Sequence, residues 1–221
     1  MIRRFLGMAA LAMLSAHASA ASLSLLTVED LVAPAFVEHA DGKRQPLAVG
    51  MGLRNKEKVH TGAGGRALLK LSEGSAVKLG ENATLAVDDL GMQDSIQGGV
   101  VSASLEVVRG AFRFTTGLLG KSATQRDVRV KVNTITAGIR GTDVWGKSET
   151  DRDIVCLLEG RVSVSHGGQQ FTMTEPNSFY IAPRTGKPLP VAPVSPEQIR
   201  EWSAETEIQR APGARPSRRR Y

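Results

Sequence analysis

Short runs in which apolar and polar residues alternate dominate the chain between about residue 31 and residue 182. ALLKL at Ala67–Leu71, VRVKV at Val128–Val132 and RVSV at Arg161–Val164 are examples. Gly, Asn or Asp, which are common turn residues, lie beside these runs. Successive side chains of a strand point to opposite faces, so the alternation predicts half-buried strands. Because the runs recur about every eight to twelve residues, we expect an all-β domain.

Composition agrees with a turn-rich β protein. The chain has 221 residues, of which 23 are Gly, and aromatic residues make up only 5%. A loose internal repeat relates Glu73–Leu79 to Glu159–Val164, each beginning at a Glu-Gly turn and followed by another short strand. We therefore expect two juxtaposed β units in a solenoid-like or sandwich-like arrangement. A chance match between two Glu-Gly turns is the alternative explanation of the repeat.

Residues 1–20 have the pattern of a cleaved export signal. Arg3 and Arg4 precede an uncharged apolar run, Phe5–Leu14, and small residues follow up to Ala20. This pattern predicts cleavage between Ala20 and Ala21. The apolar run is much shorter than the roughly 20 residues that a membrane-spanning helix needs, although an uncleaved anchor is the alternative. We expect a periplasmic protein with no transmembrane segment in the mature chain.

The composition changes after the β region, which we place at 21–182. Residues 183–196 form a Pro-rich linker, and Ser195 followed by Pro196 and Gln198 is a typical helix start. We expect a short C-terminal helix at 197–210 and a disordered Arg-rich tail at 211–221. A helix of about 12 residues is marginal alone in water. It must therefore pack on the β body or on a partner.

The formal net charge of +6 belongs mainly to the two ends of the chain. Two arginines lie in the leader, and five lie near the C-terminus, at Arg210, Arg215, Arg218, Arg219 and Arg220. The β body is close to neutral and lacks the basic face with interleaved aromatics that a nucleic-acid site needs. We therefore expect no nucleic-acid partner.

No constellation of catalytic, metal-binding or cofactor-binding residues is evident. The single cysteine, Cys156, excludes an intrachain disulfide and a multi-cysteine metal site. It lies in the apolar run Ile154–Leu158, where a thiol is a poor nucleophile, although a pairing with His60 or His166 is the functional alternative. The carboxylate pairs Asp88-Asp89 and Asp151/Asp153 lie in turn-like segments typical of solvated acids, although acid/base pairs or loose calcium ligands are the alternative. We expect a protein that is not an enzyme and needs no cofactor.

The segment Thr134–Trp145 is the most distinctive stretch of the chain. It places Arg140 beside Gly141 and ahead of Asp143 and Trp145. One interpretation is a β-arch kept open by its glycines. The other is an interaction corner formed by Arg140, Asp143 and Trp145, in which the Arg140 guanidinium meets Asp143.

Four blocks, in order, resemble the FecR domain family. Val59–Ser75 is similar to its V-x-T-G-x-G-G-x-A-x-L-x-L-x-D-G-S motif, with Glu73 in place of the aspartate, and Leu105–Phe114 to its L-x-x-G-x-x-x-F strand. Ile139–Asp143 resembles its R-G-T corner, with Trp145 near the usual aromatic, and Leu158–Val164 its closing G-x-V-x-V. The resemblance covers about residues 47 to 165.

The resemblance implies a β-solenoid-like domain that acts in envelope signalling through a protein partner. Founding members are membrane-spanning sigma-factor regulators. This chain is expected to lack their cytoplasmic sigma-binding segment and membrane helix, so direct sigma-factor regulation is not expected. Our leading hypothesis is a non-enzymatic periplasmic module that binds an envelope or membrane protein. A carbohydrate-binding or peptidoglycan-binding module is the alternative, and a hydrolase or metal enzyme is a third hypothesis.

Overall fold

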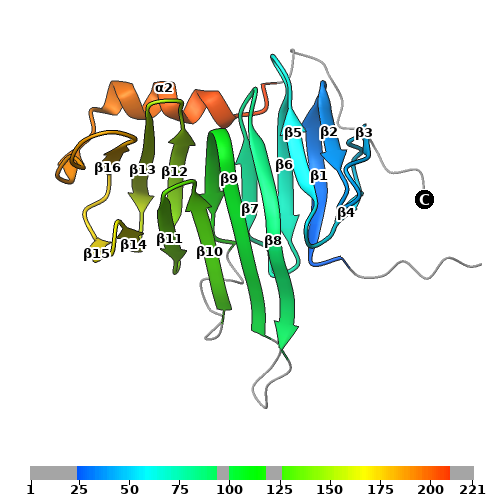
Figure 1. Cartoon of the computed structure of the whole chain (residues 1–221), viewed down its shortest axis with the longest axis horizontal. Coiled ribbons are helices and arrows are strands. Elements are labelled where there is room, and N and C mark those ends of the chain that lie inside the picture. Colours follow the sequence, from blue (N-terminus) through cyan, green and yellow to red (C-terminus); the bar gives the residue numbers. More distant parts are fainter. Residues whose placement is uncertain (1–23, 94–99, 118–125, 210–221) are drawn as a thin grey trace, which may run out of the picture.

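The computed structural model describes residues 24–93, 100–117 and 126–209, and these are mostly strands (Figure 1). Within these ranges the one helix is α2 (Pro196–Thr206), and no helix is long and apolar enough to cross a membrane. The all-β prediction with a short C-terminal helix is therefore confirmed. The predicted signal peptide, its cleavage site at Ala20 and Ala21, and the tail at 211–221 lie outside the described residues.

The described strands form two hydrogen-bonded sheets. The first has the strand order β4 (Gly52–Leu53), β1 (Leu26–Val32), β6 (Arg66–Leu71), β7 (Ala76–Leu79), β9 (Val100–Thr115), β12 (Asp143–Ser148), β13 (Arg152–Glu159), β16 (Ser178–Pro183) and β17 (Ala192–Pro193). The second has the order β3 (Arg44–Pro46), β2 (Ala35–Glu38), β5 (Lys58–Thr61), β8 (Thr84–Gln93), β9, β10 (Arg126–Val132), β11 (Ile135–Ile139), β14 (Val162–His166) and β15 (Gln169–Met173). Neighbouring strands are antiparallel except for the β9–β10 pair, which is parallel.

Strand β9 belongs to both sheets. Its first part pairs with β8 and β10 in the second sheet, and from Gly110 onward it pairs with β12 in the first. Gly110 has a φ of +83°, and a Cβ there would lie 2.6 Å from Cα of Ala83. Only glycine fits such a positive φ at so close an approach. The residue type at this one position therefore allows the strand to cross from one sheet to the other.

The two sheets face each other across one apolar core. Alternate residues of β6, namely Ala67, Leu69 and Leu71, are buried there together with Leu85 of β8 and Leu105 of β9. The alternation seen in the sequence thus has its physical cause in a sandwich with one dry face per sheet.

The loose sequence repeat does not describe the architecture. The turn at Glu73-Gly74 joins β6 to β7 within the first sheet. The turn at Glu159-Gly160 instead takes the chain from β13 in the first sheet to β14 in the second. The two Glu-Gly turns therefore have different roles, and their similarity reflects local turn chemistry rather than a structural repeat.

Helix α2 packs on the outer face of the first sheet, on the side away from the main core (Figure 1). The Ser195 hydroxyl caps its N-terminus by accepting a hydrogen bond of 3.2 Å from the amide of Gln198. The helix starts at Pro196, as its cap predicts, but ends at Thr206 rather than at residue 210. The indole of Trp202 stacks on Trp145 of β12, with ring centroids 4.7 Å apart and planes 2° apart. This stack lies in a second apolar cluster with Ile154 and Cys156.

We expect Trp202→Ala to lower the free energy of unfolding by about 2 kcal/mol or more, because it removes a stacked aromatic ring from the cluster under α2. Urea unfolding followed by far-UV circular dichroism measures the loss. The near-UV signal of the stacked indoles should also disappear. Leu189→Ala is the control, since Leu189 is 49% exposed and its truncation should change stability by less than about 0.5 kcal/mol. Equal effects of the two substitutions would show that the stack does not hold α2.

Candidate functional site

The structure separates the three residues of the predicted interaction corner. Arg140 is exposed in the turn between β11 and β12. Asp143 forms a bidentate ion pair with Arg113 of β9, at 2.7 and 2.9 Å, rather than with Arg140. Trp145 is fully buried beneath α2. Asp143 and Trp145 therefore stabilise the fold, and only Arg140 is accessible. A role for Arg140 in binding a partner stays a prediction.

Cys156 is buried in β13 without a histidine partner. His166 lies 2.9 Å from the Tyr180 hydroxyl, and His60 lies 3.0 Å from the Thr84 hydroxyl. Burial raises the pKa of the Cys156 thiol to about 12, with a smaller contribution from the Asp143 charge. A thiol held so far from ionisation at neutral pH is not an activated nucleophile.

The carboxylate pairs do not form acid/base or metal sites. Asp88 and Asp89 lie within β8 at a shift of its register, not in a turn as expected. Asp153 is fully buried and accepts hydrogen bonds from the Thr134 amide and hydroxyl, and it lies 3.0 Å from Arg184. Asp151 is exposed and apart from it. In the described residues no group of three His, Cys, Asp or Glu side chains is arranged to hold a metal ion.

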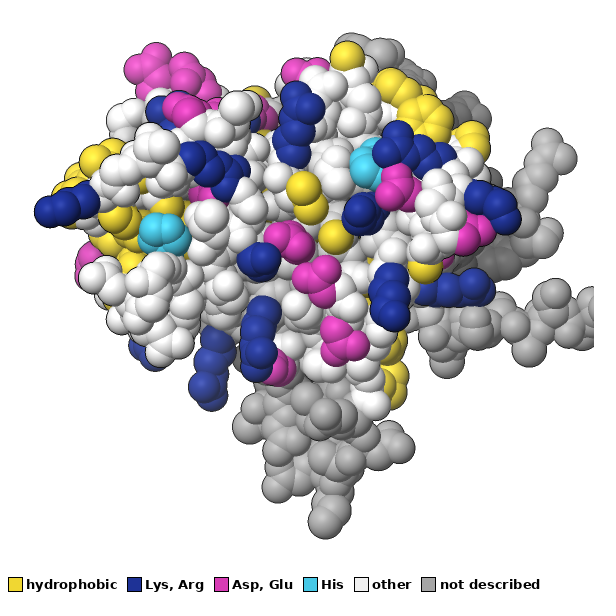
Figure 2. Space-filling view, in the orientation of Figure 1, with side chains coloured by type: hydrophobic (Ala, Val, Ile, Leu, Met, Phe, Trp, Pro, Cys, Tyr) yellow, Lys and Arg dark blue, Asp and Glu magenta, His cyan; other side chains and the backbone are white. Residues whose placement is uncertain are grey.

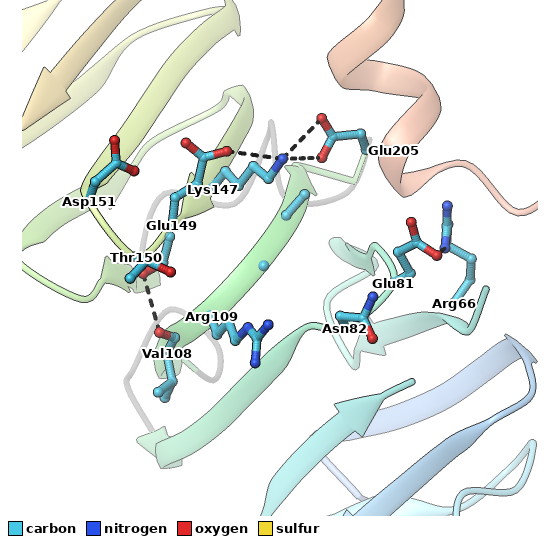
Figure 3. A pocket seen from close by; sticks show the side chains of 13 residues that line it. Arg66, Glu81, Asn82, Val108, Arg109, Lys147, Glu149, Thr150, Asp151 and Glu205 are labelled. Carbon is cyan, nitrogen blue, oxygen red and sulfur yellow. Dashed lines mark hydrogen bonds and ion pairs between the residues drawn. The ribbon is translucent and has the colours of Figure 1, made fainter. Parts of the chain in front are cut away.

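A groove of about 1050 Å³ lies where β9 crosses between the sheets (Figure 3). Its floor is the backbone of Val108–Ala111. Arg66 and the turn at Glu81-Asn82 form one wall, and the β12–β13 loop at Ser148–Asp151 forms the opposite wall. Glu205 of α2 and Lys147 of β12 close one end. We consider this groove the candidate functional site.

A β-bulge shapes the floor of the groove. Opposite β8, Thr84 pairs with Arg109 and Leu85 with Val107, so Val108 has no partner residue on that strand. The Ser148 hydroxyl donates a 3.2 Å hydrogen bond to the Val108 carbonyl and ties the bulge to the opposite wall. A bulge redirects the side chains beside it. As a result Val108 is 44% exposed and Arg109 extends into the groove.

Most charges around the groove are paired. Lys147 lies 3.2 Å from Glu149 and 3.0 Å from Glu205. Burial raises the pKa of Glu149, but the hydrogen bonds from Arg152 and Lys147 outweigh burial and hold this pKa below its usual range. Burial lowers the pKa of Lys147, but its two carboxylate partners outweigh that effect and keep the pKa above its usual range. Lys147 thus links the loop to α2.

Two charged side chains of the groove have no such partner. Arg109 and Asp151 form no hydrogen bond or ion pair with the side chains that the structure describes. Sequence reasoning did not single out Arg109 for a site, and it named Asp151 only as part of the pair with Asp153. Gly110, which follows Arg109 inside a long strand, could have indicated the site, because an interior glycine often marks a bulge.

Most of the groove lies in a region that matches a known protein family. Residues 57–163 match the model of the FecR protein family. The chain carries a FecR domain. Of the described residues that line the groove, only Glu205 lies outside this domain. The resemblance seen in four sequence blocks is therefore confirmed, and the FecR domain supplies the floor and both walls of the groove.

Solved structures show the same fold. Two crystal structures of a candidate anti-sigma factor from Parabacteroides distasonis ATCC 8503, at 1.65 and 2.50 Å resolution, superpose with TM-scores of 0.52 and 0.51. Sequence identity is 15% in both, and the alignments cover 66% of this chain and 64% or 63% of the other. The chain thus spans just under two thirds of that protein. No curated protein matches the chain.

The burial of Cys156 predicts how its thiol reacts with a labelling reagent. In the folded protein at pH 8, Cys156 should not react with a thiol-specific reagent over minutes, because its pKa is about 12 and the side chain is fully covered. In guanidinium chloride the same thiol should be labelled completely. Absorbance of the released chromophore measures both states. Fast labelling of the native protein would contradict the burial of Cys156.

Lys147→Met should lower stability by about 1 kcal/mol at neutral pH, because it removes the cation that the partly buried carboxylates of Glu149 and Glu205 share. The pKa of Glu149 in the folded protein lies below its ordinary value of 4.5. Its contribution is therefore present above pH 4.5 and is lost as pH falls through the folded value. Lys147 has a pKa above its ordinary 10.5, so its contribution is present below pH 10.5 and is lost at higher pH.

The stability difference between wild type and Lys147→Met should accordingly persist between about pH 5 and pH 10 and shrink below about pH 4. Urea unfolding at a series of pH values measures it. Lys187→Met is the control, because Lys187 is exposed and lies outside the groove. A difference that is constant down to pH 3 would show that the ion pairs around Lys147 do not contribute.

Proposed function

We propose that the chain is a non-enzymatic protein-interaction module that acts in signal transduction at the bacterial cell envelope. The observation that carries this proposal is the FecR domain at residues 57–163. The structural neighbour, whose name describes an anti-sigma factor, supports a regulatory role for this fold. The export signal predicted at residues 1–20 supports a periplasmic location.

The chemistry of the described residues favours binding over catalysis. The one thiol is buried and far from ionisation at neutral pH. The buried carboxylate of Asp153 is held by Thr134 and Arg184. A catalytic acid or nucleophile has to reach a substrate, and neither of these groups is accessible. The groove, in contrast, offers an accessible arginine, Arg109, and an exposed apolar side chain, Val108, and arginine is enriched at protein interfaces.

A protein partner also fits the placement of the aromatic residues better than a glycan does. Sugar-binding modules present aromatic rings to the solvent. Among the described residues, Trp145 and Tyr180 are buried, and Trp202 uses its face to stack on Trp145. No tryptophan or tyrosine ring of the described surface is therefore free to form a sugar platform.

On the face drawn in Figure 2, Lys and Arg side chains are interspersed with Asp and Glu. Lys131 pairs with Glu106 at 2.9 Å and Arg129 with Asp127 at 2.6 Å. Such a mixed surface produces no extended positive field of the kind that attracts nucleic acid. This face is thus suited to a partner with mixed charge, which a protein provides.

Affinity capture tests the proposal. Tagged mature protein, residues 21–221, is crosslinked in intact cells, and solubilised envelope proteins bound to it are identified by mass spectrometry. We expect enrichment of one membrane receptor or signalling protein over a tag-only control, and reciprocal capture by that protein. Recovery of cell-wall fragments alone, or of nothing above the control, would overturn the proposed function.

A further inference from the structure

We propose that the groove at the β9 crossover binds an extended, carboxylate-bearing segment of the partner protein, with Arg109 as its ion-pairing group and Val108 as its apolar contact. This inference rests on the proposed function and specifies where and by what chemistry the partner is held.

The bulge in β9 presents these two side chains together. Val108 lacks an opposing residue on β8 and is 44% exposed, and Arg109 follows it immediately. The positive φ of Gly110 and the hydrogen bond from Ser148 to Val108 hold the backbone in this shape. A site formed on a fixed strand loses little conformational entropy on binding. The bulge therefore presents one apolar and one cationic group in a set geometry.

The charges of the groove point to an acidic ligand group at Arg109. Lys147 is already neutralised by Glu149 and Glu205, and Arg66 lies 4.0 Å from Glu81. Arg109 has no such partner, and Figure 3 shows its side chain extending across the floor in the direction of Asn82. A guanidinium offers a planar pair of donors that matches a carboxylate. An incoming carboxylate would thus meet a free cation with a neutral amide nearby.

The opposite wall carries an acidic side chain that is unpaired among the described residues, so its ligand group should be basic. Asp151 is exposed in the β12–β13 loop and lies across the groove from Arg66 and Glu81 (Figure 3). A basic side chain of the same segment is its natural partner. The bound segment should therefore carry an acidic residue, an apolar residue and a basic residue in succession, so that each meets Arg109, Val108 and Asp151 respectively.

The size and lining of the groove favour a peptide over a small metabolite. Its volume of about 1050 Å³ is at the upper end of small-molecule pockets. Such pockets are mostly apolar, whereas seven of the residues that line this groove are charged: Arg66, Glu81, Arg109, Lys147, Glu149, Asp151 and Glu205. An extended chain segment brings its own charges and fills a groove of this kind.

Nuclear magnetic resonance with defined peptides tests the site. The probe is acetyl-Glu-Val-Lys-amide, and the matched neutral peptide is acetyl-Gln-Val-Gln-amide. Peptide concentrations up to about 10 mM detect dissociation constants in the millimolar range. We expect the charged peptide to cause saturable shifts at Val108, Arg109 and Asp151. The neutral peptide should bind at least about tenfold more weakly.

Arg109→Gln should weaken binding of the charged peptide about tenfold, as loss of one charge-assisted hydrogen-bonded pair does. Arg161→Gln is the matched control, since Arg161 is also exposed but lies outside the groove, and it should bind like wild type. Absence of saturable shifts in the groove, or equal binding by wild type and Arg109→Gln, would overturn the inference.

Capture with the same variants separates this inference from the proposed function. If wild type enriches a membrane partner and Arg109→Gln lowers that enrichment at least about tenfold, both the groove inference and the proposed function are supported. If Arg109→Gln captures the partner as well as wild type does, the groove inference fails while the proposed function stands. If wild type itself captures nothing, the proposed function fails.

Discussion

The crossing of β9 from one sheet to the other joins the two sheets through one continuous strand. One strand pairs with β8 and β10 before Gly110 and with β7 and β12 after it. The register of both sheets is therefore set by a single stretch of backbone. The same crossing requires a positive φ at Gly110. The bulge just before it places Val108 and Arg109 outside the core. The fold and the candidate site thus share one physical origin.

Helix α2 is coupled to the same region through a few specific contacts. Trp202 stacks on Trp145, and beyond the helix Glu207 pairs with Lys78 at 2.6 Å and with Arg113 at 3.3 Å. Arg113 also forms an ion pair with Asp143. The Arg113 guanidinium therefore connects Asp143, a residue of the predicted corner, to Glu207 at the end of the helix. A helix of this length is not stable by itself. Its position, and with it the end of the groove that Glu205 closes, depends on packing against the first sheet.

Much of the architecture was predictable because it depends on local patterns. Alternation predicted the strands, the Ser195 cap predicted the start of α2, and the apolar run around Cys156 predicted an inert thiol. The interaction corner was not predictable in the same way. Local sequence placed Trp145 in the same short segment as Arg140, but the burial of Trp145 depends on Trp202 in a different element. The groove was missed for the same reason, because its walls come from segments that are distant in the chain.

The all-β class, the start of α2 and the FecR resemblance follow from the amino-acid sequence alone. These properties depend on side-chain alternation, capping and turn residues within a few positions of each other. Which charges are neutralised depends on how the chain folds. Lys147 and Arg109 look alike as basic residues of strands, yet Lys147 meets Glu205, which is 58 positions away, and Arg109 meets no acid among the described residues. Ion pairing depends on distance in space, and only the folded chain defines that distance.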